Sequence, residues 1–275
     1  MEICNKEILT VMNFLSKLFF KKKEEEKESS NYFFHFTKKF EHLVSILYNN
    51  FMPFYCMENM RYLNMPELKL EGMAYPMVCF CDIPLSRHKL HKKKFGDYGL
   101  GLNKEWGIKK NHLTPVVYSS QNSITSAALK NLIEIFLLLE KKLSDEDYRK
   151  FKNSVSVLMM HYKPYEGYLF NKNNKQFSKE LTRFYDEKEW RYIPLKVDGL
   201  NLSLEMKDYL IDKKLVEENE KIQKDNHLIF SPNDIYSIYL TKESEIEILL
   251  DRIKCKYKPS ELSDIKEKII INNEK

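Results

Sequence analysis

The sequence predicts an α+β protein with a central, mostly antiparallel sheet and packed helices. Three observations predict this class. Aromatic and aliphatic runs of strand length recur along the chain, and segments with helical spacing separate them without a strict strand–helix alternation. In addition, 43% of the 275 residues are hydrophobic, which is sufficient for one large core or a core with a small appendage.

A helical extension, residues 1–30, precedes the globular domain. The run Ile8–Phe20 is apolar, but polar residues interrupt it and it is shorter than the roughly 20 residues of a membrane span. We expect a helix that docks on the body or on a partner subunit, and an amphipathic helix on a membrane surface is the alternative. The charged stretch Lys21–Ser30 is a linker or a solvated helix extension, because it has almost no apolar side chains to bury.

Residues 31–275 are predicted to form a single α+β domain. Its first half contains four strands, rich in aromatic and aliphatic residues, and one helix with apolar residues at helical spacing. The strands are Asn31–Thr37, Tyr75–Ile83, Gly99–Leu102 and Leu113–Tyr118, and the helix is Phe40–Tyr48.

The second half begins with a helical insertion around residues 124–160, which we predict to be a hairpin packed against the sheet. Ile124–Leu143 is a strongly apolar helix, and Asp145–Met160 continues as a second helix that begins near an aspartate cap. The remaining predicted elements are the strands Trp190–Val197, Leu228–Phe230 and Ile235–Leu240 and the helices Met206–Lys221, Glu243–Lys254 and Ser260–Ile271.

Composition limits the partners and the compartment. The formal charge is +5, but 45 Lys and Arg are nearly balanced by 40 Asp and Glu, which favours only weak attraction to polyanions. The number of cysteines, five, is odd, and they are not spaced as in a disulfide-bonded domain, as expected where thiols stay reduced. Because we find neither a transmembrane segment nor a secretory signal, we predict a cytoplasmic protein.

Three polar clusters carry candidate chemistry. In the first, His35 and Thr37 lie two residues apart on a strand, so the ring and the hydroxyl face the same side and can bind a ribose or a phosphate. A lone strand histidine is more often structural, and that alternative stays open.

The second cluster runs from Cys79 to Leu102 and contains Gly96, Gly99 and Gly101. Glycines gathered in one loop indicate tight backbone geometry or close approach to a ligand, although the spacing is not that of a phosphate-binding loop. Its polar candidates are Asp82, Ser86, Arg87, His88, His91 and Tyr98, while Lys92–Lys94 are predicted to be solvated or weakly phosphate-attracting.

A metal site in the second cluster is disfavoured. Cys79 and Cys81 have one intervening residue, which is narrower than the thiolate spacing of structural zinc sites, even with His88 and His91 nearby. We therefore predict no metal. Cys81 as a nucleophile is similarly unsupported.

In the third cluster, Glu187 and Glu189 are separated by one residue, so on an extended strand both carboxylates face one way. Two adjacent carboxylates are costly unless they are used or paired. Ion pairing with Arg183 or Arg191 is the structural alternative. The functional interpretation is a glutamate that binds a ribose hydroxyl and stabilises a sugar cation as a leaving group departs.

Several longer motifs resemble the AbiGi family of abortive phage-resistance proteins. They are HFT, PMVCFCDIPLS, YGLGLNKEWGI, KPYEG at Lys163–Gly167, FYDEKEWRYIP and SPNDIYSIYL, and together they cover roughly Tyr32–Leu250. The resemblance implies a role in abortive infection. It also implies a partner protein, since the family is described as an antitoxin that is paired with a toxin.

A second resemblance is to ADP-ribosyltransferases, particularly the DarT-like group that modifies DNA. It rests on HFTKKFEHLVSIL, on the CF-containing strand with a following Ser and Arg, and on the downstream E-x-E. It implies an ADP-ribosyltransferase-like sheet and NAD as a substrate. The implied roles are cofactor contact for His35, nicotinamide binding for Ser86, Arg87 or Tyr98, catalysis for Glu189 and assistance for Glu187. Asp82 and Pro84 depart from the DarT-like pattern, which leaves the acceptor, a nucleic acid or a protein, open.

We therefore predict an NAD-dependent ADP-ribosyltransferase-like effector of phage defence, in which His35, Tyr98 and Glu189 converge on one cleft. The alternative is an antitoxin or regulatory binding protein on the same scaffold without catalytic activity. A third class, plain nucleic-acid binding, requires a one-sided basic patch, which the balanced charge does not predict.

Overall fold

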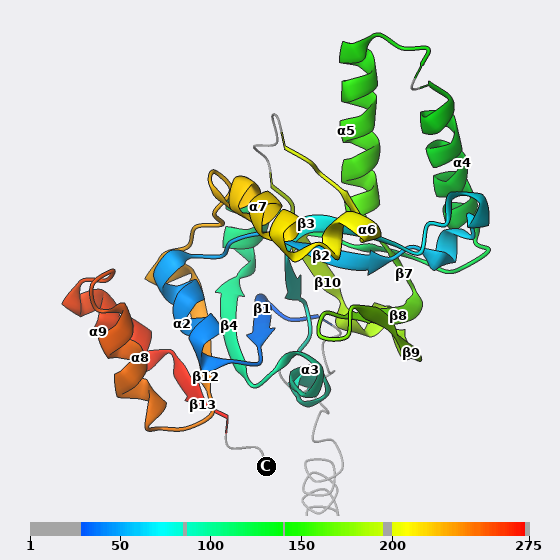
Figure 1. Ribbon diagram of the computed structural model, residues 1–275. Helices are drawn as coiled ribbons and strands as arrows, with labels where there is room; N and C mark the ends of the chain where they lie inside the picture. The colour runs from blue at the N-terminus through cyan, green and yellow to red at the C-terminus, as the bar shows by residue number, and fades with distance from the viewer. Residues whose placement is uncertain (1–28, 85–86, 140, 195–199, 273–275) are drawn as a thin grey trace, which may run out of the picture.

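The computed structural model describes residues 29–84, 87–139, 141–194 and 200–272, so the predicted helix in residues 8–20 and Ser86 lie outside the described residues. Within these ranges the chain has an α+β fold with a mostly antiparallel sheet (Figure 1). Nine of the described strands form this sheet, in the order β13-β12-β4-β1-β3-β10-β5, with β2 and β11 also paired to β3. The strands are β1 Tyr32–Thr37, β2 Phe54–Asn59, β3 Gly72–Cys81, β4 Tyr98–Asn103, β5 Thr114–Pro115, β10 Glu189–Tyr192, β11 Leu204–Glu205, β12 Ile235–Leu240 and β13 Ile269–Ile271.

The long strand β3 joins two parts of this sheet. Its first half pairs with β2, with Gly72 opposite Asn59 at one end and Met77 opposite Phe54 at the other. Its second half pairs with β10. β1 is also a neighbour of β3 but meets it at one pair, Phe34 opposite Cys81. β1 pairs with β4 along its whole length, so β3 is the neighbour with which it pairs least.

Helices cover the sheet near β4 and β12. α2 (Phe40–Asn49) buries Leu43 and Leu47, four residues apart on one face, in a core that it shares with the sheet and with α8 (Glu245–Ile253) and α9 (Pro259–Glu267). Figure 1 shows α2 between the sheet and these two helices. The predicted strand–helix pair at the start of the domain is therefore confirmed, because the apolar residues of that helix recur at helical spacing.

The predicted hairpin of two helices is present, but it is not packed along the sheet, and its first helix ends at Leu139 and not at Leu143. α4 (Ile124–Leu139) and α5 (Asp145–His161) project from the body (Figure 1). Ser144, and not the predicted aspartate, caps α5, since its side chain accepts a hydrogen bond of 3.2 Å from the backbone N–H of Asp147. Among the described residues, no helix is both long and apolar enough to cross a membrane.

Several predicted boundaries differ from the structure. The predicted strand Leu113–Tyr118 is two short strands, β5 and β6 (Val117–Ser119), because Pro115 has no N–H and Val116 donates to the carbonyl of Glu189. The strand predicted at Leu228–Phe230 is wrong, since only Leu228 makes a bridge, with Phe51. The strand predicted at Trp190–Val197 is β10, which ends at Tyr192, and residues 195–199 are not described.

Two predicted helices are also shorter than expected. The helix predicted over Met206–Lys221 is two helices, α6 (Met206–Tyr209) and α7 (Asp212–Gln223), because Ile211 has an extended backbone. The helix predicted over Ser260–Ile271 ends at Glu267, and the β-branched run that follows forms β13 beside β12.

The sequence did not predict three elements that surround the site. They are α3 (His88–Phe95), the hairpin of β8 (Glu166–Asn171) and β9 (Gln176–Arg183), and the short strand β7 (Tyr162–Pro164), which pairs with β6. α3 is too rich in lysine to show an apolar stripe, so helical spacing did not indicate it.

Candidate functional site

β1 and β3 line a narrow hollow of about 150 Å³, here called the inner hollow. Phe34, His35 and Phe36 of β1 line one side, and Cys79, Phe80 and Cys81 of β3 line the other. Its other polar lining comes from Glu58, His91, Lys163, Glu187 and Glu189. The inner hollow therefore brings together residues from six separate segments of the chain.

The side chain of His35, on β1, is hydrogen-bonded to the backbone of β3. Its Nδ1 lies 2.8 Å from the carbonyl oxygen of Cys79, and since a carbonyl only accepts, Nδ1 carries the proton and Nε2 is left as an acceptor. The ring packs edge-on against Phe51 and Phe80, with centroids 5.1 and 5.8 Å away. Burial lowers the pKa of His35, which keeps the imidazole neutral at physiological pH.

Glu187 and Glu189 meet in the inner hollow by a route that differs from the prediction. They do not share one extended strand: Glu187 ends the 3₁₀ turn η5 (Phe184–Glu187), and Glu189 begins β10. Lys188 between them has a left-handed backbone with φ of 45°, and its N–H closes the turn onto the Tyr185 carbonyl. The backbone N–H of Glu189 donates to the Tyr118 hydroxyl at 2.9 Å.

Two buried cations hold these carboxylates. The ammonium of Lys163, on β7, lies 2.8 Å from Glu187 Oε2 and 2.6 Å from Glu189 Oε2. The guanidinium of Arg191 binds Glu189 Oε1 through Nε at 2.7 Å and Glu58 Oε1 through Nη2 at 2.9 Å. Arg191 also donates to the Met160 carbonyl. The predicted pairing of the E-x-E motif with an arginine is thus confirmed for Arg191, whereas Arg183 lies 4.0 Å from Asp186.

This network keeps Glu189 ionised. Burial opposes its negative charge, but the positive charges of Arg191 and Lys163 outweigh burial and hold the pKa of this carboxyl well below its usual range. Burial likewise opposes the charge of Lys163, yet the two glutamates raise its pKa. Glu189 is therefore a fixed negative charge in a place from which water is largely excluded.

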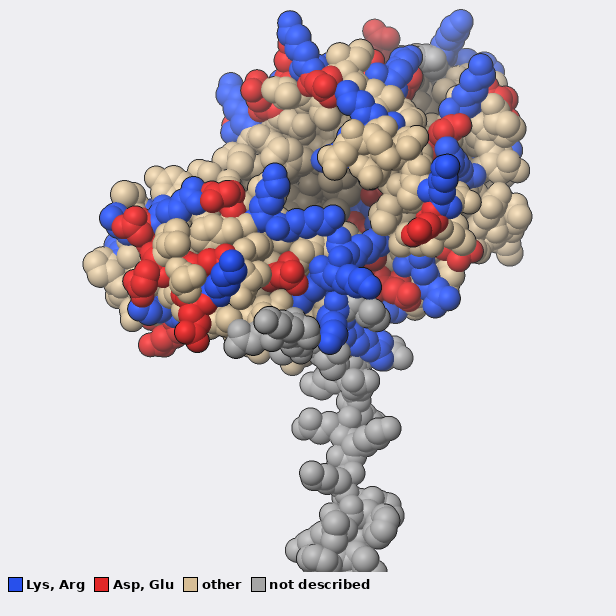
Figure 2. Space-filling view, turned by 60° about the horizontal axis from the view of Figure 1, so that its bottom comes forward, with Lys and Arg blue, Asp and Glu red and all other residues tan. Residues whose placement is uncertain are grey.

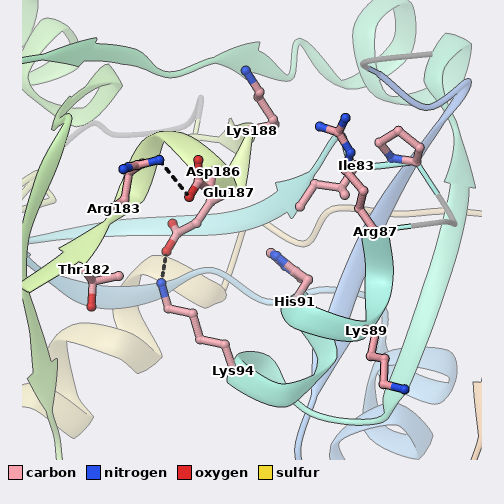
Figure 3. Close-up of a pocket in the computed structure, with 11 residues that line it drawn as sticks. Ile83, Arg87, Lys89, His91, Lys94, Thr182, Arg183, Asp186, Glu187 and Lys188 are labelled. Carbon is pink, nitrogen blue, oxygen red and sulfur yellow. Dashed lines mark hydrogen bonds and ion pairs between the residues drawn. The ribbon is translucent and has the colours of Figure 1, made fainter. Parts of the chain in front are cut away.

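The inner hollow adjoins a wider one of about 550 Å³, the outer hollow, because His91 and Glu187 line both. Five basic side chains line the outer hollow together with Asp186 and Glu187: Arg87, Lys89, Lys94, Arg183 and Lys188. Figure 3 shows His91 and Lys94 of α3 and Glu187 of η5 pointing into it, with Lys94 paired to Glu187. On the face that carries α3, Lys and Arg side chains gather near the middle (Figure 2). The excess of positive charge suits an anionic ligand.

His91, at the junction of the two hollows, is neutral. Burial, with the nearby His88 and Lys94, lowers its pKa to about 3. The junction thus presents a neutral imidazole beside the carboxylate of Glu187.

Several residues predicted at the site are elsewhere. The hydroxyl of Tyr98 donates to Glu245 at 2.7 Å, so the structure does not bring Tyr98 together with His35 and Glu189. Thr37 is hydrogen-bonded to His42 of α2 at 3.1 Å and does not line either hollow. The carboxylate of Asp82 accepts a hydrogen bond from the backbone N–H of Ser30 and forms an ion pair with Lys104 at 2.7 Å. Arg87, one of the residues predicted to bind nicotinamide, lines the outer hollow.

The thiols and imidazoles of the second cluster do not form a metal site in the described part of the chain, where no group of three or more His, Cys, Asp or Glu is arranged to hold an ion. His88 instead lies 3.0 Å from the Ile83 carbonyl through Nε2. Burial raises the pKa of both Cys79 and Cys81, which keeps them as thiols.

Lys163 and Glu58 are site residues that sequence reasoning missed. Lys163 stands in the KPYEG motif, which was the available signal, but a lone lysine before a proline has no spacing that indicates a buried ion pair. Glu58 lies on β2, a strand that was not predicted.

Comparisons with known proteins identify relatives of most of the chain. A family model described as "Putative abortive phage resistance protein AbiGi, antitoxin" matches residues 49–241, which include all of the buried charges. The chain is also 32% identical, over 236 residues, to a Lactococcus lactis subsp. cremoris protein named "Abortive phage resistance protein AbiGi". That match covers 81% of this chain and 94% of the relative. No solved structure is significantly similar to the chain.

Proposed function

The chain belongs to the AbiGi family of abortive phage resistance proteins, and from this premise we propose that it acts in phage defence as an ADP-ribosyltransferase-like enzyme with NAD as its substrate. The observation that carries the proposal is the meeting of His35 with Glu187 and Glu189 in the inner hollow, beside a basic outer hollow. This arrangement suits a dinucleotide, which has a sugar to be held and two phosphates to be neutralised.

The dimensions and charges support this assignment. The outer hollow, at about 550 Å³, falls within the usual range for ligand pockets of roughly 300–1,000 Å³. Its arginines and lysines suit the two negative charges of a pyrophosphate. The inner hollow offers aromatic walls for a nicotinamide ring and polar groups for the adjoining ribose.

The proposed step breaks the bond between ribose C1′ and the nicotinamide nitrogen, and the electron pair leaves with the nicotinamide. Positive charge develops on the ribose, and the fixed charge of Glu189 stabilises it. Nε2 of His35 accepts a hydrogen bond from a ribose hydroxyl, since Nδ1 already donates one to the Cys79 carbonyl. The nucleophilic atom of the acceptor, a nucleic acid or a protein, then bonds to C1′ and loses its proton.

Release of nicotinamide from NAD tests the proposal. The purified full chain is assayed with and without DNA, RNA and cell lysate, beside Glu189→Gln and a matched control, Glu166→Gln, which changes an exposed glutamate on β8. We expect release by the native chain and the control and a loss of at least 100-fold in Glu189→Gln. If circular dichroism shows that Glu189→Gln does not fold, His35→Gln serves instead, because its amide can still donate to Cys79. Folded native protein without release under any condition would refute the enzyme proposal.

One observation favours a second candidate, a non-catalytic antitoxin or regulatory protein. All four oxygens of Glu187 and Glu189 already have a cationic partner within the chain: Lys94, Lys163 and Arg191. Ion pairs that occupy every oxygen of both carboxylates can have a purely structural role, in which they hold β7, η5 and β10 together. On this alternative, Glu189→Gln changes stability or partner binding, and no nicotinamide appears. Co-purification of a toxin from cells that carry the neighbouring genes would then be the decisive assay.

A further inference from the structure

A third cavity, here called the aromatic pocket, lies beside η5 and the start of β10. Its volume is about 330 Å³, which is at the lower end of the usual range for ligand sites. Three aromatic side chains line it: Tyr118 of β6, Tyr185 of η5 and Trp190 of β10. The proposed bond cleavage uses none of these rings.

Contacts within the chain hold the three rings in place. Tyr185 lies edge-on to Tyr118, with ring centroids 5.4 Å apart, and stacks on Tyr165, with centroids 5.5 Å apart. The backbone N–H of Tyr185 donates to the Tyr165 carbonyl at 3.2 Å. The ring of Trp190 packs against Phe33, with centroids 4.9 Å apart. Although Tyr185 is 42% exposed, its ring therefore needs little further ordering when a planar ligand binds.

Two polar groups of the aromatic pocket can bind a ligand. The hydroxyl of Tyr118 accepts a hydrogen bond from the Glu189 N–H and donates its own proton to no residue that the structure describes. The ammonium of Lys188 lies 3.7 Å from the centre of the Tyr185 ring and has no carboxylate partner among the described residues. Figure 3 shows the Lys188 side chain directed away from Glu187. The pocket therefore suits a planar ring that accepts hydrogen bonds and lies near negative charge, and it disfavours a cationic ligand.

The aromatic pocket adjoins both hollows of the candidate site. It shares Lys188 with the outer hollow and Glu189 with the inner hollow. Lys188 can therefore lie between phosphates in the outer hollow and a ring in the aromatic pocket. A nucleoside diphosphate joins a planar ring to two phosphates in this way.

We propose that the aromatic pocket binds the adenine ring of NAD and that Tyr185 and Trp190 provide its stacking surfaces. The assignment rests on the proposed function, in which nicotinamide occupies the inner hollow and the pyrophosphate occupies the outer hollow. The ring nitrogens of adenine accept hydrogen bonds, which suits the proton of the Tyr118 hydroxyl. The pocket then distinguishes NAD from nicotinamide mononucleotide, which has the same reactive bond but no adenine.

Calorimetric titration of the full chain with ADP and with inorganic pyrophosphate tests the site without turnover. We expect the native chain to bind ADP at least about tenfold more tightly than pyrophosphate, because only ADP has the ring. Tyr185→Ala should reduce this ratio to below about threefold, whereas Tyr185→Phe should retain it. Tyr48→Ala is the matched control and should also retain it, since Tyr48 is a 43% exposed tyrosine on α2. A native chain that binds ADP no more tightly than pyrophosphate, or a ratio unchanged in Tyr185→Ala with native circular dichroism, overturns the proposal.

Substrate kinetics separate the adenine site from the enzyme proposal. Where nicotinamide is released, Tyr185→Ala should raise the KM for NAD at least about fivefold more than the KM for nicotinamide mononucleotide. Loss of the ADP preference in Tyr185→Ala, with no nicotinamide release by the native chain, would support the adenine site and refute the enzyme. An unchanged KM for NAD, with release that no longer responds to DNA, RNA or cell lysate, would assign Tyr185 to the acceptor and overturn the adenine site.

Discussion

Replacing Lys163 with methionine should destabilise the protein, because Lys163 is the cation shared by two buried carboxylates. Its ammonium lies 2.8 Å from Glu187 and 2.6 Å from Glu189, and its side chain is 10% exposed. Removing one partner from a buried ion pair costs about 3–5 kcal/mol, since the remaining charge loses both water and its counter-ion. For a chain of this size that corresponds to a fall in Tm of roughly 10 °C.

The pH dependence of this loss gives the prediction its sign. In the native protein the pKa of Glu189 is depressed from its ordinary value of 4.5, so its stabilising contribution is present above pH 4.5 and is lost as the pH falls below it. In Lys163→Met, Glu187 and Glu189 are left as close like charges, and protonation relieves their repulsion. The difference in unfolding free energy between the two proteins should therefore be larger at pH 7 than at pH 5.

Thermal and urea unfolding, followed by circular dichroism at both pH values, measure this difference. Lys150→Met is the control, because the 70% exposed Lys150 pairs with Glu146 at the surface and its loss should cost less than about 0.5 kcal/mol. Lys163→Met/Glu187→Gln should recover at least about 1 kcal/mol of the loss, since it removes one of the facing charges. A loss below about 1 kcal/mol for Lys163→Met, or one that is equal at pH 5 and pH 7, would refute the reasoning.

The remaining predictions concern the backbone, the outer hollow and the histidines. Gly96→Ala should cost at least about 2 kcal/mol in urea unfolding, because Gly96 has φ of 120° and a Cβ there would lie 2.2 Å from the Thr37 carbonyl oxygen; an unchanged midpoint would contradict this. Arg183→Ala should raise the KM for NAD about fivefold with little change in kcat, and 0.5 M salt should reduce the difference, whereas an effect on kcat alone would exclude a role in phosphate binding. Nicotinamide release should show no inflection from Glu189 or His91 between pH 5.5 and 7.5, since Glu189 stays ionised and His91 stays neutral, and burial also lowers the pKa of His35. The pKa of His91 is about 3 in the folded protein against 6.5 in the unfolded chain, so the free energy of unfolding should rise as the pH increases between these two values. His91→Gln should flatten this part of the stability profile.

The parts of the fold that periodicity describes were predicted well. The apolar spacing in Phe40–Tyr48 and the aromatic run in Asn31–Thr37 correspond to α2 and β1 within a residue or two at each end. Local pattern failed where an element is polar, as in the lysine-rich α3, or where a proline divides a strand, as at Pro115. In both places the backbone conformation depends on neighbours that are distant in the sequence.

The candidate site was predicted in part. His35, Arg87, Glu187 and Glu189 line the two hollows, as their residue types suggested. Tyr98 does not, because β4 pairs with the opposite edge of β1 and directs this tyrosine to Glu245. Resemblance to a motif selects residue types, but the pairing of strands decides which of them share a cavity.

By itself, the sequence determined the α+β class, the stronger helices and strands, the motifs of the AbiGi family and the residues that can carry charge. Only the tertiary structure decided that Lys163 lies between Glu187 and Glu189, which follow it by 24 and 26 residues. It also decided that β1 and β3 pair at one position and that both line a hollow beside His35. The physical reason is that periodicity reports how each segment is buried, whereas contacts between distant segments depend on the register in which the strands pair.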